Sequence, residues 1–162
     1  LLARELGQES VIVRRMLTAG LLHDIGKVAI PQSLLNKPGR LTSEEFTKLM
    51  THPVVGWEIC KPLRTAQSVL DCILYHHERF DGCGYPEGLS GEAIPYQARL
   101  LAVADAPDAL TSDRAYRRRL SVDEAVQLLG DETEDGTWAP EIYSALTRLA
   151  QRGQADPRRL EV

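Results

Sequence analysis

Six side chains of this sequence could together bind metal ions. They are four imidazoles and two carboxylates: His23, Asp24, His52, His76, His77 and Asp105. Four of the six form two adjacent pairs, one His-Asp and one His-His. Two neighbours near a helix end can offer two ligands to a common point. Asp105 follows an apolar run, residues 100–104, where an uncompensated carboxylate would be costly. The set as a whole predicts a metal site.

The ligand types indicate which metals and which chemistry to expect. Imidazole together with carboxylate suits iron, manganese, nickel or zinc better than calcium or magnesium. One carboxylate can bridge two ions, and two ions ~3.5–4 Å apart can activate a water for attack on phosphorus. A single histidine near a helix end is more often a capping or surface residue, and Asp105 alone could be a buried hydrogen-bonding group. These alternatives stay open for each residue taken singly.

The elements that must hold these side chains are predicted to be helices. Apolar residues recur at helical spacing, and no stretch alternates as a strand would. The predicted helices cover residues 11–25, 42–52, 66–79, 96–112, 121–130 and 140–151, with a further helix starting at Pro53. Residues 30–39, with one short turn at 33–35, and residues 81–88 are predicted loops, because glycine or proline marks them. The predicted fold class is all-α.

Local signals support several of these helix starts. Thr42 and Ser121 are each followed by glutamate three residues later, which is the pattern of a capping box. Pro53 and Pro140 suit the first turn of a helix, where the missing N–H group costs little.

The composition limits what this chain can be. Its 162 residues fit one domain, and its net charge of −4 argues against binding a nucleic acid polymer. No apolar run approaches the roughly 18 residues that a membrane span needs. Three cysteines without CxxC spacing cannot all pair, so we expect reduced thiols and a cytoplasmic location. The first residue is Leu1 rather than Met, so we expect a fragment of a longer polypeptide.

Three motifs resemble those of the HD-GYP subgroup of HD-domain phosphohydrolases. Residues 23–27, His-Asp-Ile-Gly-Lys, resemble the HD signature. Residues 76–86, HHERFDGCGYP, resemble the HHExxDGxGYP signature of the subgroup, and this segment is highly specific. Residues 103–114, VADAPDALTSDR, resemble its VADxxDALTSxR segment. The likeness extends from about residue 16 to residue 151.

This resemblance implies both a fold and an activity. The fold would be an HD-domain helical bundle with the additional C-terminal helices characteristic of the HD-GYP subgroup. The activity would be hydrolysis of cyclic di-GMP to linear pGpG, and on to GMP. The cofactors would be two or three divalent metal ions, iron or manganese in the first place and nickel or zinc as alternatives. A hydroxide shared by two ions would attack phosphorus in line.

The resemblance also assigns roles at the metal site. The six residues named at the outset would be the ligands, and Asp24 would bridge two ions. Lys27 lies three residues after Asp24, so a helical path would direct it into the same cleft, where it could contact phosphate or assist the leaving oxygen. The alternative for Lys27 is a salt bridge to Asp24.

Other residues would bind the substrate. Arg114 and Arg117 would contact phosphates, since the planar guanidinium suits phosphate geometry. Asp108 is grouped with them through its motif. Tyr85 and its loop would line the substrate site, with the ring stacked on a guanine or simply pinning the loop. The same loop could instead bind a partner, such as a diguanylate cyclase (GGDEF) domain.

The sequence departs from the family pattern in three respects. Family members supply a further histidine from a helix before the HD pair, and residues 1–7 are predicted to be the end of that helix. Residues 1–162 are therefore expected to be one HD-GYP domain lacking its first ligand-bearing helix. Pro107 falls inside a predicted helix, where a kink could move Asp105 or Asp108. Ala115 stands where the family often has proline.

Two further functions stay open at this stage. The chain could be an HD phosphohydrolase of another nucleotide, such as a mixed cyclic dinucleotide. It could also be a non-catalytic sensor that binds the dinucleotide or a partner domain. An upstream regulatory domain is expected in either case.

Overall fold

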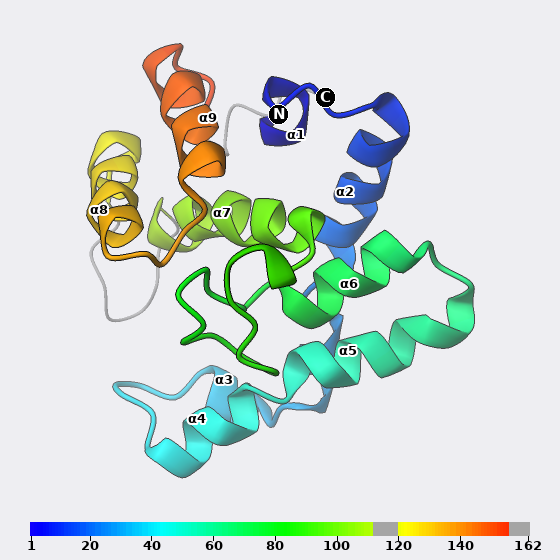
Figure 1. The fold of residues 1–162 in the computed structure, drawn as a ribbon. Coiled ribbons are helices and arrows are strands. Elements are labelled where there is room, and N and C mark those ends of the chain that lie inside the picture. The colour runs from blue at the N-terminus through cyan, green and yellow to red at the C-terminus, as the bar shows by residue number, and fades with distance from the viewer. Residues whose placement is uncertain (112–119, 156–162) are drawn as a thin grey trace.

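The computed structural model describes residues 1–111 and 120–155, apart from the side chains of residues 108 and 109 (Figure 1). Within these ranges every regular element is a helix and no strand occurs, which confirms the predicted all-α class. The predicted substrate-binding residues Arg114 and Arg117, and the side chain of Asp108, lie outside the described part.

The helices follow one another with short connections. In chain order they are α1 (Leu2–Glu5), α2 (Ser10–Leu22), the 3₁₀ helix η1 (Ile25–Ala29), α3 (Gln32–Leu35), α4 (Ser43–Leu49), α5 (His52–Cys60), the 3₁₀ helix η2 (Lys61–Leu63), α6 (Gln67–Tyr75), the 3₁₀ helix η3 (Gly91–Ala93), α7 (Tyr96–Thr111), α8 (Val122–Glu134) and α9 (Pro140–Gln151).

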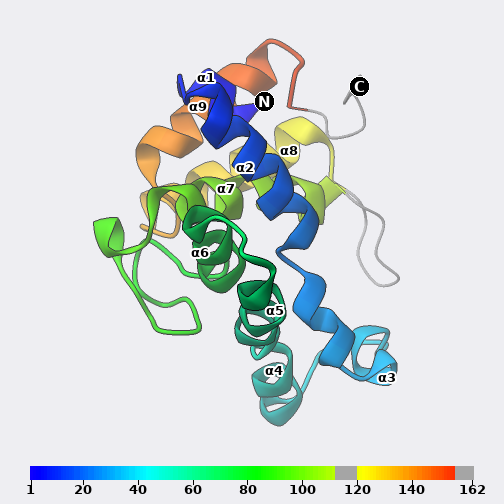
Figure 2. The same ribbon diagram turned by 90° about the vertical axis from the view of Figure 1, so that its right-hand side faces the viewer.

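Helix α7 is the central element of the fold. It contacts α1, α2, α6, α8 and α9, and its residues Leu100 and Val103 are buried in the main apolar core. Ile73 of α6 and Ile142 of α9 belong to the same core. Figures 1 and 2 both show α9 and α1 at one end of the molecule, α7 and α6 in the middle, and α5 and α4 at the other end.

Both capping boxes predicted from the sequence are present. The Thr42 hydroxyl accepts the Glu45 N–H at 3.3 Å, and the Glu45 carboxylate accepts the Thr42 N–H at 2.8 Å. The pair at the start of α8 has the same reciprocal arrangement. Helix α9 begins at Pro140 and ends at Gln151, as predicted.

Helix α2 ends earlier than predicted, at Leu22 instead of Ile25. The cause is close packing between η1 and α5. A Cβ atom on Gly26 would lie only 1.9 Å from the backbone oxygen of His52. The chain must therefore leave the axis of α2 for the backbone at Gly26 to reach α5, and the His-Asp pair falls in the turn between α2 and η1.

Three other predicted boundaries are also corrected. Helix α6 ends at Tyr75 because the backbone at Gly84 packs against the backbone of the residues that follow the helix. A Cβ atom added to Gly84 would lie 2.3 Å from the backbone nitrogen of Arg79. The helix predicted over residues 42–52 ends at Leu49, and His52 is the first residue of α5, which was predicted to start at Pro53. Helix α8 continues beyond Gly130, whose role is close contact with the Tyr143 ring of α9.

Pro107 does not end α7, which continues to Thr111.

The three cysteines are free thiols. None of the helices in residues 1–111 and 120–155 combines the length and the apolar character that crossing a membrane requires.

Candidate metal centre

The six side chains predicted to bind metal converge from four parts of the fold. The turn after α2 supplies the His-Asp pair, α5 supplies its first residue, the turn after α6 supplies the His-His pair, and α7 supplies Asp105. Residues more than eighty positions apart in the chain thus meet at one place. The kink considered for Pro107 does not carry Asp105 away.

Asp24 connects the two halves of this cluster. Its Oδ1 atom lies 3.3 Å from Nε2 of His52 and 4.0 Å from Nε2 of His76. Its Oδ2 atom lies 3.5 Å from Nε2 of His23, and that nitrogen is also 3.5 Å from Oδ1 of Asp105. Four ligand atoms lie within 4.8 Å of one another, one from each of Asp24, His52, His76 and His77.

The backbone fixes which ring nitrogen of the histidines faces the cluster. In His23, His52 and His76, Nδ1 lies 2.8, 2.7 and 2.9 Å from the carbonyl oxygen three residues earlier. A carbonyl only accepts hydrogen bonds, so Nδ1 carries a proton, and in the neutral imidazole Nε2 keeps its lone pair. Metal-binding histidines are oriented in this way by a second hydrogen bond.

The arrangement fits a bound cation. Nε2 of His52 and Nε2 of His76 face each other at 3.4 Å, and two lone pairs at that distance repel unless a positive charge lies near them. Oδ1 of Asp24 is buried and receives no hydrogen bond from the described residues, which is costly for a carboxylate oxygen. A divalent ion with mixed nitrogen and oxygen ligands would relieve both features.

The protonation of the His76-His77 pair also suits ligation. Burial, together with the neighbouring imidazoles, lowers the pKa of both His76 and His77 to about 3, so both are neutral near pH 7. Burial alone would lower the pKa of His23, but the hydrogen bond to Asp105 and the charge of Asp24 raise it above its usual value. Burial would raise the pKa of Asp24, but His52 and Lys27 hold it well below its usual range.

Lys27 forms the salt bridge that the sequence left as an alternative. Its Nζ atom donates to Oδ2 of Asp24 at 2.6 Å, and both side chains are partly exposed. The ammonium group therefore lies at the open side of the cluster. A role for Lys27 at the phosphate or at the leaving oxygen stays a prediction.

Tyr85 lies directly on the cluster. Its ring stacks on the His77 ring with centroids 4.8 Å apart and planes inclined by 25°, and its N–H donates to the His77 carbonyl at 3.2 Å. Burial raises the pKa of the Tyr85 phenol above its usual value, so the ring stays neutral. The peptide bond to Pro86 is cis. The side chain is half-buried, at the rim of the cluster.

Glu78 organises the loop that carries Tyr85, a role that the sequence reasoning missed. Only 3% of its surface is exposed, and its carboxylate accepts N–H groups from Glu87, Gly88 and Leu89 at 2.7, 3.1 and 3.0 Å. Three successive backbone donors on one buried carboxylate define the path of the loop. The only available signal was the position of this glutamate beside the paired histidines.

We expect the substitution Glu78→Gln to loosen this loop. The amide has one acceptor oxygen in place of two, so its NH₂ group would meet a backbone N–H that donates as well. The free energy of unfolding should fall by about 2 kcal/mol, the scale of hydrogen bonds to a charged group. Amide hydrogen exchange at residues 87–89 should become faster, as measured by mass spectrometry.

The matched control is Glu87→Gln. Glu87 is an exposed carboxylate in the same loop and accepts one hydrogen bond, from the Tyr75 hydroxyl at 3.2 Å. Exchange at residues 87–89 should stay at the wild-type rate in this variant. Unchanged protection in Glu78→Gln would contradict the role assigned to Glu78.

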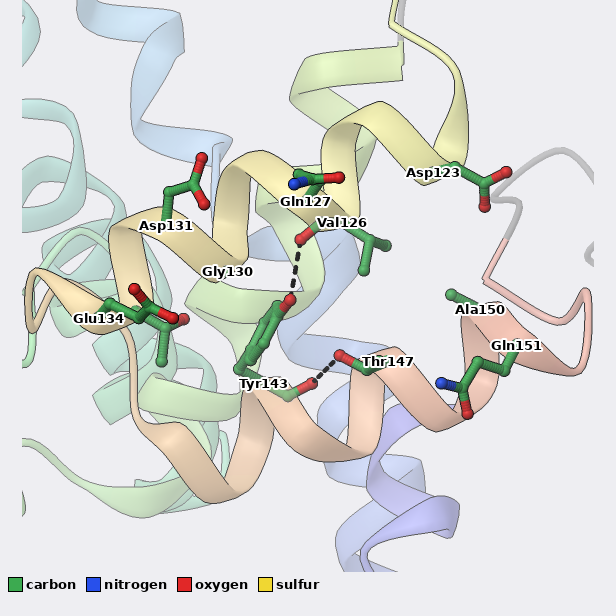
Figure 3. A pocket seen from close by; sticks show the side chains of 11 residues that line it. Asp123, Val126, Gln127, Gly130, Asp131, Glu134, Tyr143, Thr147, Ala150 and Gln151 are labelled. Carbon is green, nitrogen blue, oxygen red and sulfur yellow. Dashed lines mark hydrogen bonds between the residues drawn. The ribbon is translucent and has the colours of Figure 1, made fainter.

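A groove of about 490 Å³ between α8 and α9 is separate from the cluster (Figure 3). Asp123, Asp131 and Glu134 line it, and the Tyr143 hydroxyl donates to the Val126 carbonyl at 3.1 Å inside it. It shares no residue with the cluster and has no histidine in its lining. The side chains predicted to bind metal therefore lie at the cluster and not in this groove.

Comparison with known proteins gives a family match and several curated relatives. The HD domain family matches residues 1–141. The chain is 43% identical to cyclic di-GMP phosphodiesterase PA4108 of Pseudomonas aeruginosa, over 91% of this chain and 35% of that protein. It is 45% identical to the cyclic di-GMP phosphodiesterase response regulator RpfG of Xanthomonas campestris, over 80% of this chain and 35% of that protein.

A third relative carries a different substrate in its name. The chain is 34% identical to 3'3'-cGAMP-specific phosphodiesterase 1 of Vibrio cholerae, over 93% of this chain and 35% of that protein. The chain thus spans about a third of the length of these relatives.

Two solved structures share the fold. Bd1817, a HDG"Y"P protein from Bdellovibrio bacteriovorus, superposes with a TM-score of 0.75 at 25% identity, over 93% of this chain and 48% of that one. The cyclic GMP-AMP specific phosphodiesterase V-cGAP3 of Vibrio cholerae gives a TM-score of 0.71 at 20% identity, over 97% and 42% of the two chains. The second likeness concerns the fold alone.

Proposed function

This chain belongs to the HD domain family, and on that basis we propose that it hydrolyses cyclic di-GMP with divalent metal ions held by the cluster around Asp24. The resemblance to HD-GYP proteins predicted from the sequence is confirmed by the family match and by the relatives. The observation that carries the proposal is the convergence of the Nε2 atoms of three imidazoles on the carboxylate of Asp24, whose Oδ1 atom is buried. The names of the similar curated enzymes support the substrate.

The proposed ligands are the six residues predicted from the sequence. Asp24 directs Oδ1 toward His52 and His76 and Oδ2 toward His23, which supports the bridging role proposed for it. When bound, the ions would lower the pKa of a water molecule and offset charge on the phosphate oxygens. We propose iron or manganese, with nickel or zinc as alternatives, and two or three ions.

The remaining proposed roles belong to charged side chains that are not metal ligands. Lys27 keeps one positive charge at the open side of the cluster, where a phosphodiester or its departing oxygen would be stabilised. Arg114 and Arg117 are proposed to contact phosphates of the substrate, and Asp108 to take part in substrate binding. The proposed products are linear pGpG and then GMP.

A mixed cyclic dinucleotide is the second candidate substrate. It is favoured by the similarity to a relative named as specific for 3'3'-cGAMP. A GGDEF partner at the Tyr85 loop, an upstream regulatory domain and a cytoplasmic location stay predictions.

The central test compares His76→Ala with Leu129→Ala, a buried truncation on α8. Metal content is measured by mass spectrometry of the purified protein, and cyclic di-GMP turnover by chromatography of the products. We expect His76→Ala to lose metal and turnover together, because it removes a ligand from the cluster. We expect Leu129→Ala to lose stability but keep its metal.

Two outcomes would overturn the proposal. Full turnover in His76→Ala would exclude the site. A wild-type chain that binds metal and cyclic di-GMP without product would instead support the non-catalytic sensor. Turnover of 3'3'-cGAMP in parallel assays distinguishes the two candidate substrates.

A further inference from the structure

An aromatic side chain outside the sequence motifs lies at the edge of the site. Phe46 of α4 is one of two phenylalanines in the chain, and 47% of its surface is exposed. Its ring centroid is 6.3 Å from that of Tyr85, with the two planes at 80°. Since Tyr85 in turn stacks on His77, three rings extend outward from the cluster.

Helix α4 is held firmly even though it buries no residue. The capping box fixes its first turn, and Lys37 Nζ donates to both carboxylate oxygens of Glu45 at 2.8 and 2.6 Å. Only Met50 and Thr51 separate its end from α5, which begins with the proposed ligand His52. The position of Phe46 relative to the cluster is therefore defined by the fold and not by packing of its own ring.

An exposed ring beside a polar site is suited to a ligand that is both charged and aromatic. A cyclic dinucleotide has this character, because each phosphate is flanked by planar bases. Aromatic side chains bind bases by stacking, which tolerates any base since every base has a π-face. The cluster would hold the phosphodiester, and a ring further out would hold the adjoining base.

We propose that Phe46 is a stacking platform for one purine base of the cyclic dinucleotide. This inference rests on the proposed function. It assigns Phe46 to affinity and not to the choice between guanine and adenine. The expected loss on truncation is thus the same for cyclic di-GMP and for 3'3'-cGAMP.

The test uses Phe46→Ala, with Phe46→Trp as the conservative variant. In Phe46→Ala, KM for cyclic di-GMP should rise about 5- to 150-fold, the range of base–aromatic stacking, while kcat changes much less. Phe46→Trp should restore KM to near the wild-type value. A cyclic dinucleotide with 2-aminopurine in place of one guanine provides a second measurement, because stacking quenches its fluorescence. The quench on binding should be present in the wild type and lost in Phe46→Ala.

The control is Leu63→Ala, which truncates another exposed apolar side chain, 66% exposed, in η2 beyond the end of α5. Its KM should match that of the wild type. A wild-type chain that binds no cyclic dinucleotide would overturn the proposed function and this inference together. Normal wild-type turnover, with KM and quench unchanged in Phe46→Ala, would overturn the inference alone. A fall in kcat and metal content at unchanged KM would also overturn the inference, because Phe46 would then act by holding Tyr85 in position.

Discussion

Replacing Asp24 by asparagine is expected to lower metal affinity by more than about a hundredfold. Residues that hydrogen-bond to the ligands of a metal typically contribute about 10- to 100-fold to metal affinity or activity. A ligand that bridges two ions should contribute more. Asparagine keeps the shape of the side chain but removes the negative charge. Its NH₂ group would replace one of the two oxygens that face His52 and His23. Turnover should fall in parallel with metal content.

Metal titration by calorimetry, followed by the turnover assay, measures both effects. The matched control is Asp71→Asn on α6, a carboxylate away from the cluster that accepts the Gln67 amide at 2.7 Å. It should bind metal like the wild type. Wild-type metal affinity in Asp24→Asn would remove Asp24 from the proposed ligand set. If Asp24→Asn keeps its metal but loses turnover, Asp24 acts in the reaction and is not needed for metal binding.

Replacing Gly26 by alanine is expected to cause the largest loss of stability. The added Cβ would lie 1.9 Å from the His52 oxygen and 2.6 Å from the Gly56 nitrogen. Both atoms belong to the backbone of α5, so no side-chain rotation can relieve the overlap. Forcing α5 away from η1 should lower the free energy of unfolding by about 3 kcal/mol or more. It should also move His52 away from Asp24 and weaken metal binding.

Urea unfolding monitored by circular dichroism, in the presence of a chelator, measures this stability without a contribution from metal. The control is Gly20→Ala in α2, where an added Cβ meets nothing within 4 Å. Alanine favours helix, so Gly20→Ala should be stabilised by up to about 1 kcal/mol. Equal stabilities for the two variants would show that the backbones of η1 and α5 are not in close contact.

The sequence predicted much of the fold because its signals are local. Capping boxes at Thr42 and Ser121, and a proline at position 140, act within one helical turn, and all three mark observed helix starts. Apolar spacing likewise identified α2 and α6, which are followed by the His-Asp pair and the His-His pair. The motifs placed the chain with HD-GYP proteins, since residue types at fixed spacing are read without any knowledge of distant contacts.

Boundaries set by contacts with other elements were not predictable in this way. Gly26 and Gly84 end α2 and α6 early because each brings one backbone against another. Gly130 looked like a helix end, but it accommodates the Tyr143 ring of α9. Glycine is equally suited to a turn and to a close approach, and its sequence position does not distinguish the two.

The residue types of the candidate centre were determined by the sequence alone: four imidazoles, two carboxylates and a nearby lysine. Only the tertiary structure decided how they meet. It set which nitrogen of His23, His52 and His76 faces inward, because backbone carbonyls hold the opposite nitrogen. It paired Lys27 with Asp24 and brought Phe46 beside Tyr85. The physical reason is that composition and spacing specify which groups are available, whereas their orientation depends on hydrogen bonds and packing between elements far apart in the chain.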